Sequence, residues 1–329
     1  MQRTLFGILA GLTAASIWGG MYVVSKAVME VIPPFALITL RLVLGMLVLF
    51  GFLIGKHIKK SRTRRSTASP DAGNGQSRSQ EPSDSRLEVN ILGITRKQFW
   101  QVFGVGFVGY GVSLGFQFVG TKLSTASYGS LVTSATPAFV LLFAALLLRE
   151  KITPRRLLAL IVASLGVLAV IYPRSSGGDP RTAQLSPSLF WGNLCLVAAA
   201  LTWALYSVLV RKVTRDIDVL TISLVAFVGG LPVSLPLGTW EATTQGHGVI
   251  TPGVFGGILF LGIIATALAM YLWNTAFATL DASVASLTFF AQPVVGTVLG
   301  AVFLGDKITP LFILGGVLIG IGLVISSKE

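Results

Sequence analysis

The sequence predicts an all-α integral membrane protein in which ten transmembrane helices form two inverted five-helix repeats. Three observations predict this fold class: the composition, the number of apolar runs and an internal repeat. Hydrophobic residues make up 53% of the 329 residues and charged residues only 12%, with a mean hydropathy of +0.79. Soluble domains carry about 25% charged residues, so this composition excludes an ordinary soluble fold.

Ten apolar runs satisfy the length that a membrane helix needs, which is about 20 mostly apolar residues. We predict helices at residues 4–26, 34–55, 98–119, 126–148, 155–172, 188–210, 218–238, 253–275, 283–304 and 309–326. Proline is tolerated in the first turn of a helix, where its missing N–H has no partner to lose. Prolines lie at or beside several predicted starts, namely Pro33-Pro34, Pro154, Pro187, Pro252 and Pro310.

The segment between the second and third runs has a different composition. Residues 57–97 are rich in Ser, Arg, Gly, Asp and Gln, with scarcely an apolar residue between 66 and 85. Such a segment cannot bury enough apolar surface to offset the entropy lost on ordering. We therefore expect a disordered cytoplasmic loop that is inserted into the first repeat.

A five-residue phrase occurs twice in the chain. Glu150-Lys-Ile-Thr-Pro154 and Asp306-Lys-Ile-Thr-Pro310 lie 156 positions apart, and an apolar run follows each. Pro137 and Pro293 correspond at the same offset. A shared offset over such a stretch predicts a tandem duplication. We assign residues 1–175 to the first five-helix repeat and residues 186–329 to the second.

The placement of Lys and Arg predicts the orientation in the membrane. With a cytoplasmic N-terminus, nineteen of these residues lie inside and five outside, and the split is nine to five without the 56–97 loop. This agrees with the positive-inside rule. Five helices per repeat is an odd number, so the second repeat enters the membrane upside down. We therefore predict an inverted repeat in the plasma (bacterial inner) membrane with both termini cytoplasmic, an architecture that supports alternating access.

Several short motifs follow one another in a recognisable order. Trp18-Gly19 and Lys26 lie in the first helix, Pro33-Pro34 precede Arg41 in the second, and the Lys-Ile-Thr-Pro turn precedes the last helix of each half. Their order and spacing resemble the drug/metabolite transporter superfamily, EamA-type, over nearly the whole chain outside 57–97. The resemblance implies a multi-pass carrier of small metabolites, often an exporter of amino acids or related compounds. It does not name a substrate.

Polar and aromatic side chains inside the apolar runs are the candidates for a substrate site near the membrane midplane. Trp18, Tyr22 and Lys26 share one face of the first helix because they follow at steps of four. Arg41 lies in the second run, where an unpaired cation is costly. Two interpretations of Arg41 stay open: a snorkelling side chain tethered to Glu30 or to helix-end carbonyls, and an anchor for a substrate carboxylate.

The remaining candidates lie later in the sequence. Pro137 and Pro293 should kink their helices, and a polar neighbour such as Gln292 can then satisfy a freed carbonyl or bind a ligand. Helix–helix hydrogen bonding is the alternative for each polar residue. The predicted substrate-binding set is Trp18, Tyr22, Arg41, Gln117, Tyr271, Asn274 and Gln292.

Other classes of function lack their signatures in this sequence. We expect no catalytic residues, cofactor or metal, because His, Asp and Glu fall at helix ends or in loops and an intramembrane enzyme would need them clustered. No Gly-rich ATP-binding loop or basic-aromatic nucleic-acid surface is present. We expect a small-molecule substrate and the lipid bilayer as partners, with a monomer and a homodimer both open. A secondary exporter or exchanger is the first hypothesis; a uniporter or channel-like facilitator and a lipid flippase are the alternatives.

Overall fold

All regular structure in the described part of the chain is helical. The computed structural model describes residues 2–67, 92–124, 126–171, 187–214 and 217–304, with isolated positions between 310 and 325. A shorter apolar run covers Thr136–Leu148. Seven helical runs are long and apolar enough to cross a membrane, namely Gln2–Val28, Pro34–Lys56, Arg96–Leu123, Trp191–Val213, Val219–Thr244, Pro252–Thr279 and Ala282–Leu299.

The N-terminal half of the chain, which ends at residue 171, contains five helical runs, and two of them are interrupted. Its helices are α1 (Gln2–Val28), α2 (Pro34–Thr67), α3 (Arg96–Gly106), α4 (Leu114–Leu123), α5 (Ala126–Val132), α6 (Thr136–Phe143) and α7 (Pro154–Ile171). The π-helical segment η1 (Phe107–Ser113) joins α3 to α4. The 3-10 turn η2 (Thr133–Ala135) joins α5 to α6, and the π-helical segment η3 (Ala144–Leu148) follows α6.

The C-terminal half, from residue 187, shows the same order of interruptions. Its described helices are α8 (Pro187–Val213), α9 (Val219–Thr244), α10 (Pro252–Leu259), α11 (Ala269–Thr279), α12 (Ala282–Leu287) and α13 (Ala291–Leu304). The π-helical segment η5 (Phe260–Leu268) joins α10 to α11. The 3-10 turn η6 (Thr288–Phe290) joins α12 to α13. Each half therefore breaks its third run with a π segment and its fourth with a 3-10 turn.

The first nine predicted segments each coincide with a helical run, and within 309–326 only scattered positions are described. Proline starts the helix in four cases: α2, α7, α8 and α10. Thr251 adds an N-cap to α10, since its hydroxyl accepts a hydrogen bond from Val254 N, which satisfies one of the unpaired first-turn donors.

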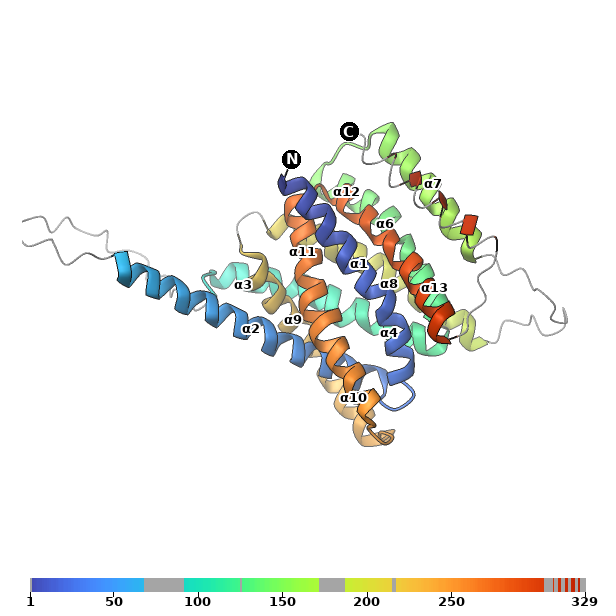
Figure 1. Cartoon of the computed structure of the whole chain (residues 1–329), viewed down its shortest axis with the longest axis horizontal. Helices are drawn as coiled ribbons and strands as arrows, with labels where there is room; N and C mark the ends of the chain where they lie inside the picture. Colours follow the sequence, from blue (N-terminus) through green and yellow to red (C-terminus); the bar gives the residue numbers. More distant parts are fainter. Residues whose placement is uncertain are drawn as a thin grey trace, which may run out of the picture.

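The prediction of a disordered 57–97 segment is wrong at both of its ends. α2 continues through residues 57–67, because Lys, Arg and Ile favour a helix here and cations are stabilised near a helix C-terminus. Figure 1 shows this part of α2 extending beyond the bundle. At the other end, Ile94 is buried and Thr95 forms a capping box with Gln98 that starts α3. Residues 68–91 lie outside the described residues.

The two halves of the chain are interleaved. α1 packs against α11 and α13 of the C-terminal half, α8 packs against α4 and α6 of the N-terminal half, and α2 packs along α9 (Figure 1). Apolar side chains on the outer faces stay exposed, with Leu47 at 64% and Phe303 at 72%. Such exposure suits contact with lipid, in which exposed apolar surface carries no penalty.

Glycine lets α3 and α9 approach backbone to backbone. A Cβ added at Gly106 would overlap the carbonyl oxygen of Ala226, and one added at Gly229 would overlap the carbonyl oxygen of Phe103. Gly104, two residues from Gly106, has open space where its Cβ would be. The pair α3 and α9 therefore depends on the absence of a side chain at Gly106, as small-residue interfaces between membrane helices do.

Gly106→Ala should lower the free energy of unfolding by about 1–3 kcal/mol, the usual cost of forcing one extra group into a packed interface. The matched variant Gly104→Ala should leave it unchanged or slightly raised, because alanine favours helix over glycine. The thermal unfolding midpoints of the two variants in detergent test this. Equal midpoints would show that the α3–α9 contact is not as close as described.

Candidate functional site

A small cavity lies in the middle of the bundle, between the two halves of the chain. Its volume is about 20 Å³, which is room for roughly one water molecule. The N-terminal half contributes Trp18, Met21, Ser113, Leu114, Gln117, Thr133 and Thr136. The C-terminal half contributes Ala199, Ala200, Trp203, Met270, Phe289 and Gln292. In this conformation the cavity is too small for a metabolite.

Aromatic rings form one wall of the cavity. The ring centroids of Trp18 and Trp203 lie 5.5 Å apart in an edge-to-face arrangement, and Phe289 lies 5.9 Å from Trp18. Trp273 supports Trp18 from behind at 5.2 Å. Such pairs are within the range of favourable aromatic contacts. The thioethers of Met21 and Met270 complete the apolar lining, and flexible side chains of this kind adapt to different ligand shapes.

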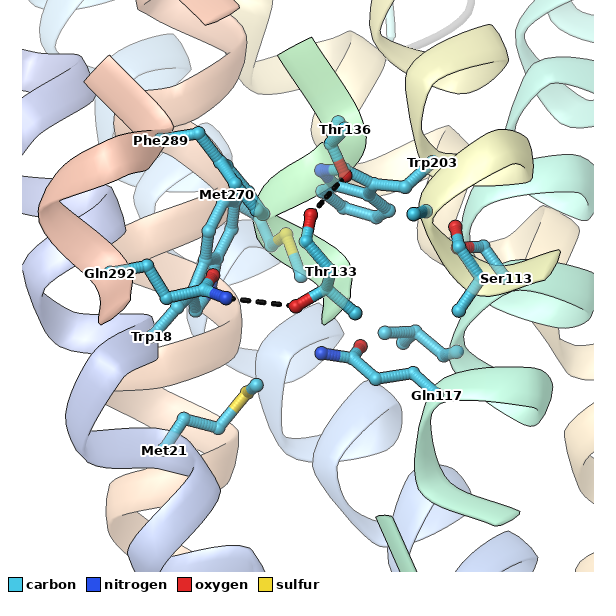
Figure 2. Close-up of a pocket in the computed structure, with 13 residues that line it drawn as sticks. Trp18, Met21, Ser113, Gln117, Thr133, Thr136, Trp203, Met270, Phe289 and Gln292 are labelled. Carbon is cyan, nitrogen blue, oxygen red and sulfur yellow. Dashed lines mark hydrogen bonds between the residues drawn. The ribbon is translucent and has the colours of Figure 1, made fainter. Parts of the chain in front are cut away.

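The hydroxyl of Thr133 is the centre of the polar wall. Gln292 Nε2 donates to Thr133 Oγ1 at 3.0 Å, as Figure 2 shows, and to the carbonyl of Ser130 at 3.1 Å. The hydroxyl of Tyr22 lies 2.8 Å from the same Thr133 oxygen, and Gln117 Nε2 donates to the Tyr22 hydroxyl. One hydroxyl thus joins side chains from α1, η2 and α13, and Tyr22 extends the network to α4.

The local fold of η2 explains why a polar group is placed at this point. Pro137 has no N–H, so the carbonyl four residues back, on Thr133, loses its helical partner. The hydroxyl of Thr136 donates to that carbonyl at 2.6 Å (Figure 2). A polar side chain beside the proline therefore satisfies the broken ladder, as a helix break inside a membrane requires. In the C-terminal half, η6 directly precedes Ala291, Gln292 and Pro293.

Arg41 is fully buried behind the cavity. Its Nε donates to Thr266 Oγ1 at 2.7 Å, and its Nη2 donates to the carbonyl of Ala265 at 3.3 Å. Its Nη1 contacts the sulfur of Met21 at 3.3 Å. The snorkelling interpretation is wrong, because the side chain has no exposed surface and Glu30 is not among its described partners. Through Met21, the guanidinium contacts a side chain that lines the cavity.

A second polar chain lies between the cavity and the end of the bundle where α8 ends. The hydroxyls of Tyr110 and Tyr206 are 2.5 Å apart, and Tyr206 donates to Asn274 Oδ1 at 2.9 Å. Asn274 Nδ2 then donates to Ser223 Oγ at 2.9 Å. These hydrogen bonds connect η1, α8, α11 and α9. They hold the four helical segments together beside the cavity, and each polar group in the series has a partner.

At both ends of the bundle, a charged side chain donates hydrogen bonds to the carbonyls at the end of a neighbouring helix. At one end, Lys26 Nζ donates to the carbonyls of Thr121, Lys122 and Ser124, where α4 ends. At the opposite end, Arg211 donates to the carbonyls of Phe277 and Ala278, where α11 ends. Cations at helix C-termini are stabilised by the helix dipole and by the unpaired carbonyls.

A carboxylate also links the two halves at the Arg211 end. The two oxygens of Glu150 accept hydrogen bonds from the backbone N–H groups of Ala282 and Ser283, at 2.9 and 3.3 Å, and from the Ser283 hydroxyl at 2.8 Å. Glu150 thus caps α12, a helix of the other half. Arg156 and Arg211 both reach Asp281, the residue before α12. Opening the cavity toward this end would require these contacts to separate.

The predicted site residues divide into three groups. Trp18, Gln117 and Gln292 line the cavity, and Tyr22 bonds directly to its polar wall. Arg41 is buried behind it and contacts the lining residue Met21, whereas Asn274 is buried in the second polar chain, bonded to Tyr206. Tyr271 lies elsewhere: it is 37% exposed and faces a separate groove of about 550 Å³ between α2, α9 and α11.

Several lining residues are absent from the predicted set. Trp203 carried a signal, since it is the counterpart of Trp18 in the second half, and Thr136 precedes Pro137 as Gln292 precedes Pro293. Thr133 lies four residues before Pro137, so the freed carbonyl marks it. Met21 and Met270 had no signal, because an apolar residue in a membrane helix is the default. In the described residues, no three His, Cys, Asp or Glu side chains lie close enough to hold a metal.

Thr133→Val should destabilise the protein, because it leaves the Tyr22 hydroxyl and the Gln292 amide short of a buried partner, which costs about 1–3 kcal/mol. Thr202→Val is the matched control, since the Thr202 hydroxyl bonds only to carbonyls of its own helix. Thermal unfolding midpoints should fall clearly for the first variant and little for the second. A similar fall in both would remove Thr133 from the centre of the network.

Comparison with known proteins agrees with this architecture. A solved crystal structure superposes with a TM-score of 0.70 and 20% identity, covering 98% of this chain and 96% of that one; this likeness concerns the fold alone. The uncharacterized transporter YoaV of Bacillus subtilis is 24% identical over 99% of this chain and 97% of its own length.

Two further relatives match part of the chain. The uncharacterized transporter YetK of Bacillus subtilis is 25% identical, and the match spans 67% of this chain and 65% of YetK. A riboflavin transporter of Brucella anthropi is 35% identical over 46% of this chain and 49% of its own length. The model of the EamA-like transporter family matches residues 5–70, 85–172 and 190–328. The chain is a multi-pass membrane protein that belongs to the EamA-like transporter family.

Proposed function

We propose that the protein is a secondary transporter of small metabolites, an exporter or exchanger, that works by alternating access of the central cavity. The observation that carries the proposal is the position of that cavity. It is lined by both halves of the chain, and charged side chains bind helix ends at both ends of the bundle. At about 20 Å³ it holds roughly one water molecule, so binding a metabolite requires the two halves to separate.

We further propose that the two halves are inverted repeats of five helices each, residues 1–175 and 186–329, with 309–326 as the tenth helix. The packing supports this proposal. α1 packs against α11 and α13, and α8 packs against the corresponding α4 and α6, while α2 packs against its counterpart α9. A two-fold relation between the halves produces this reciprocal pattern.

The ends of the helices support opposite orientations of the two repeats. Lys26 and Arg211 each follow a tryptophan, Trp18 and Trp203, by eight positions, and each caps the third run of its own half. Near Arg211, a Cβ at Gly7 of α1 would meet Thr279 and Leu280. The start of α1 and the end of α8 thus lie at one end of the bundle. The distribution of Lys and Arg supports a cytoplasmic location for that end.

The relatives support a small organic compound as the substrate but do not identify which compound this chain transports. One of them carries the name riboflavin transporter, and it shares less than half of this chain. We therefore propose a small amphipathic organic compound, in the size range of amino acids and vitamins. A lining that mixes indole rings, thioethers, amides and hydroxyls suits such a compound, since ligand pockets combine an apolar body with a few placed polar groups.

Counterflow in proteoliposomes tests the proposal. Purified protein is reconstituted, vesicles are loaded with an excess of one unlabelled candidate metabolite, and uptake of the same labelled compound is followed. An alternating-access carrier should accumulate the label transiently above equilibrium, because the loaded compound drives its return. A channel-like facilitator would only equilibrate the label, and that result for every accepted compound would refute the carrier mechanism.

A further inference from the structure

We infer that the substrate of this carrier is a planar aromatic carboxylate, with its ring among Trp18, Trp203 and Phe289 and its carboxylate on Arg41. The inference rests on the proposed function and adds the chemical class of the cargo. Two buried groups beside the cavity carry it: a cation without a carboxylate partner and an indole N–H without an acceptor.

The cation is Arg41. Its guanidinium has five N–H donors, and the described contacts use three of them. One of these three meets the Met21 sulfur, which is a weak acceptor. The other acceptors are neutral, and the ring of Phe118 lies 5.2 Å from the guanidinium carbon. Among the described ion pairs none involves Arg41. A buried charge without a counter-ion is costly, and a bound anion would neutralise it.

Met21 connects Arg41 to the cavity. Its sulfur accepts the Nη1 contact, and the same side chain lines the cavity. Figure 2 shows Met21 on the α1 side of the cavity, beside Trp18 and across from Gln117. Methionine is unbranched and changes rotamer easily. A rotation of Met21 would exchange the weak sulfur contact for the bidentate pairing that a carboxylate makes with guanidinium.

The indole N–H belongs to Trp203. The side chain is 7% exposed, and its Nε1 has no hydrogen-bond partner in the described structure. Figure 2 shows the indole reaching from α8 toward Thr136 and the centre of the cavity. The two other indoles nearby are satisfied, since Trp18 donates to the Ala265 carbonyl and Trp273 to Ser207. A ring of the substrate that carries an acceptor would pair with Trp203 and stack between the aromatic faces.

Amines are disfavoured by the same arrangement. None of the residues that line the cavity is acidic, and the cation Arg41 contacts the lining residue Met21. An organic cation would enter a site with no counter-ion and with a like charge behind Met21. The ammonium group of a zwitterion would meet only neutral dipoles. We therefore expect an aromatic carboxylate to bind more tightly than an aromatic amino acid, and the amino acid to bind more tightly than an amine.

Four compounds that share the indole ring separate these classes: indole-3-propionate, its primary amide, tryptophan and tryptamine. Binding to the full-length protein in detergent is measured by calorimetric titration, and exchange by proteoliposome counterflow. Indole-3-propionate should bind at least about tenfold more tightly than the amide or tryptamine, a difference of about 1.4 kcal/mol. Cyclohexanepropionate, which lacks the aromatic ring, should also bind more weakly.

Variants test whether Arg41 and the Trp203 indole N–H are the groups that select the ligand. Arg41→Gln should remove the preference for the carboxylate over the amide, and Arg41→Lys should keep part of it, because the charge remains and the fork is lost. Arg3→Gln, the same change at an exposed site, should preserve the preference. Trp203→Phe should weaken the binding of a quinoline carboxylate, whose ring nitrogen accepts a hydrogen bond, and should spare indole-3-propionate, whose ring nitrogen only donates. The ligand series on the unaltered protein keeps the test decisive if a variant does not fold.

The outcomes separate this inference from the proposed function. Equal or tighter binding of tryptamine or the amide, or no binding of any compound in the series, would overturn the aromatic carboxylate class. Counterflow of another compound would then leave the carrier function standing. Binding of the carboxylate without any exchange would support the class and contradict the carrier.

Discussion

The carbonyl oxygen of Ala265 holds the two halves of the chain together at the cavity. It accepts hydrogen bonds from the Trp18 indole of α1 and from the Arg41 guanidinium of α2. The carbonyl lies in the π-helical segment η5. The backbone N–H of Ala269, the first residue of α11, donates to the carbonyls of Ile264 and Thr266, which flank Ala265 at this change from π to α pairing. Inside a membrane such a group must find a partner within the protein.

This constraint explains the placement of the site. At two helix breaks beside the cavity, a hydroxyl of the same helical run donates to a backbone carbonyl. The Thr136 hydroxyl donates to the Thr133 carbonyl before Pro137. The Thr266 hydroxyl accepts a hydrogen bond from Arg41 and donates to the Leu261 carbonyl. The breaks are where the helices can change shape at low cost, so the same turns that create the cavity are suited to opening it.

Breaks were predicted beside Pro137 and Pro293, but the π-helical segments and the buried faces of the helices were not. Pro137 and Gln292 beside Pro293 predicted polar groups at matching positions, because a missing N–H has a local consequence. No such local signal showed that Asn274 is buried and that Tyr271 is exposed on the outer surface. Lipid is as apolar as the protein interior, so a helix that is apolar on all sides gives no periodic signal of which face is buried. Two partners of Arg41, Thr266 and Ala265, were equally hidden, since they lie more than two hundred residues away in the chain.

The central claim is that one cavity between the halves is reached alternately from the two sides of the membrane. It is tested most directly by a single thiol at Ser113, a small buried residue of the lining. Ser113→Cys is combined with Cys195→Ser, because Cys195 is the only native cysteine, and a membrane-impermeant thiol reagent is applied from either side of oriented vesicles. The account predicts labelling from both sides, protection by a bound substrate, and faster labelling from the cytoplasmic side when Glu150→Gln weakens the cap on α12. Labelling from one side only, in every condition, would contradict it.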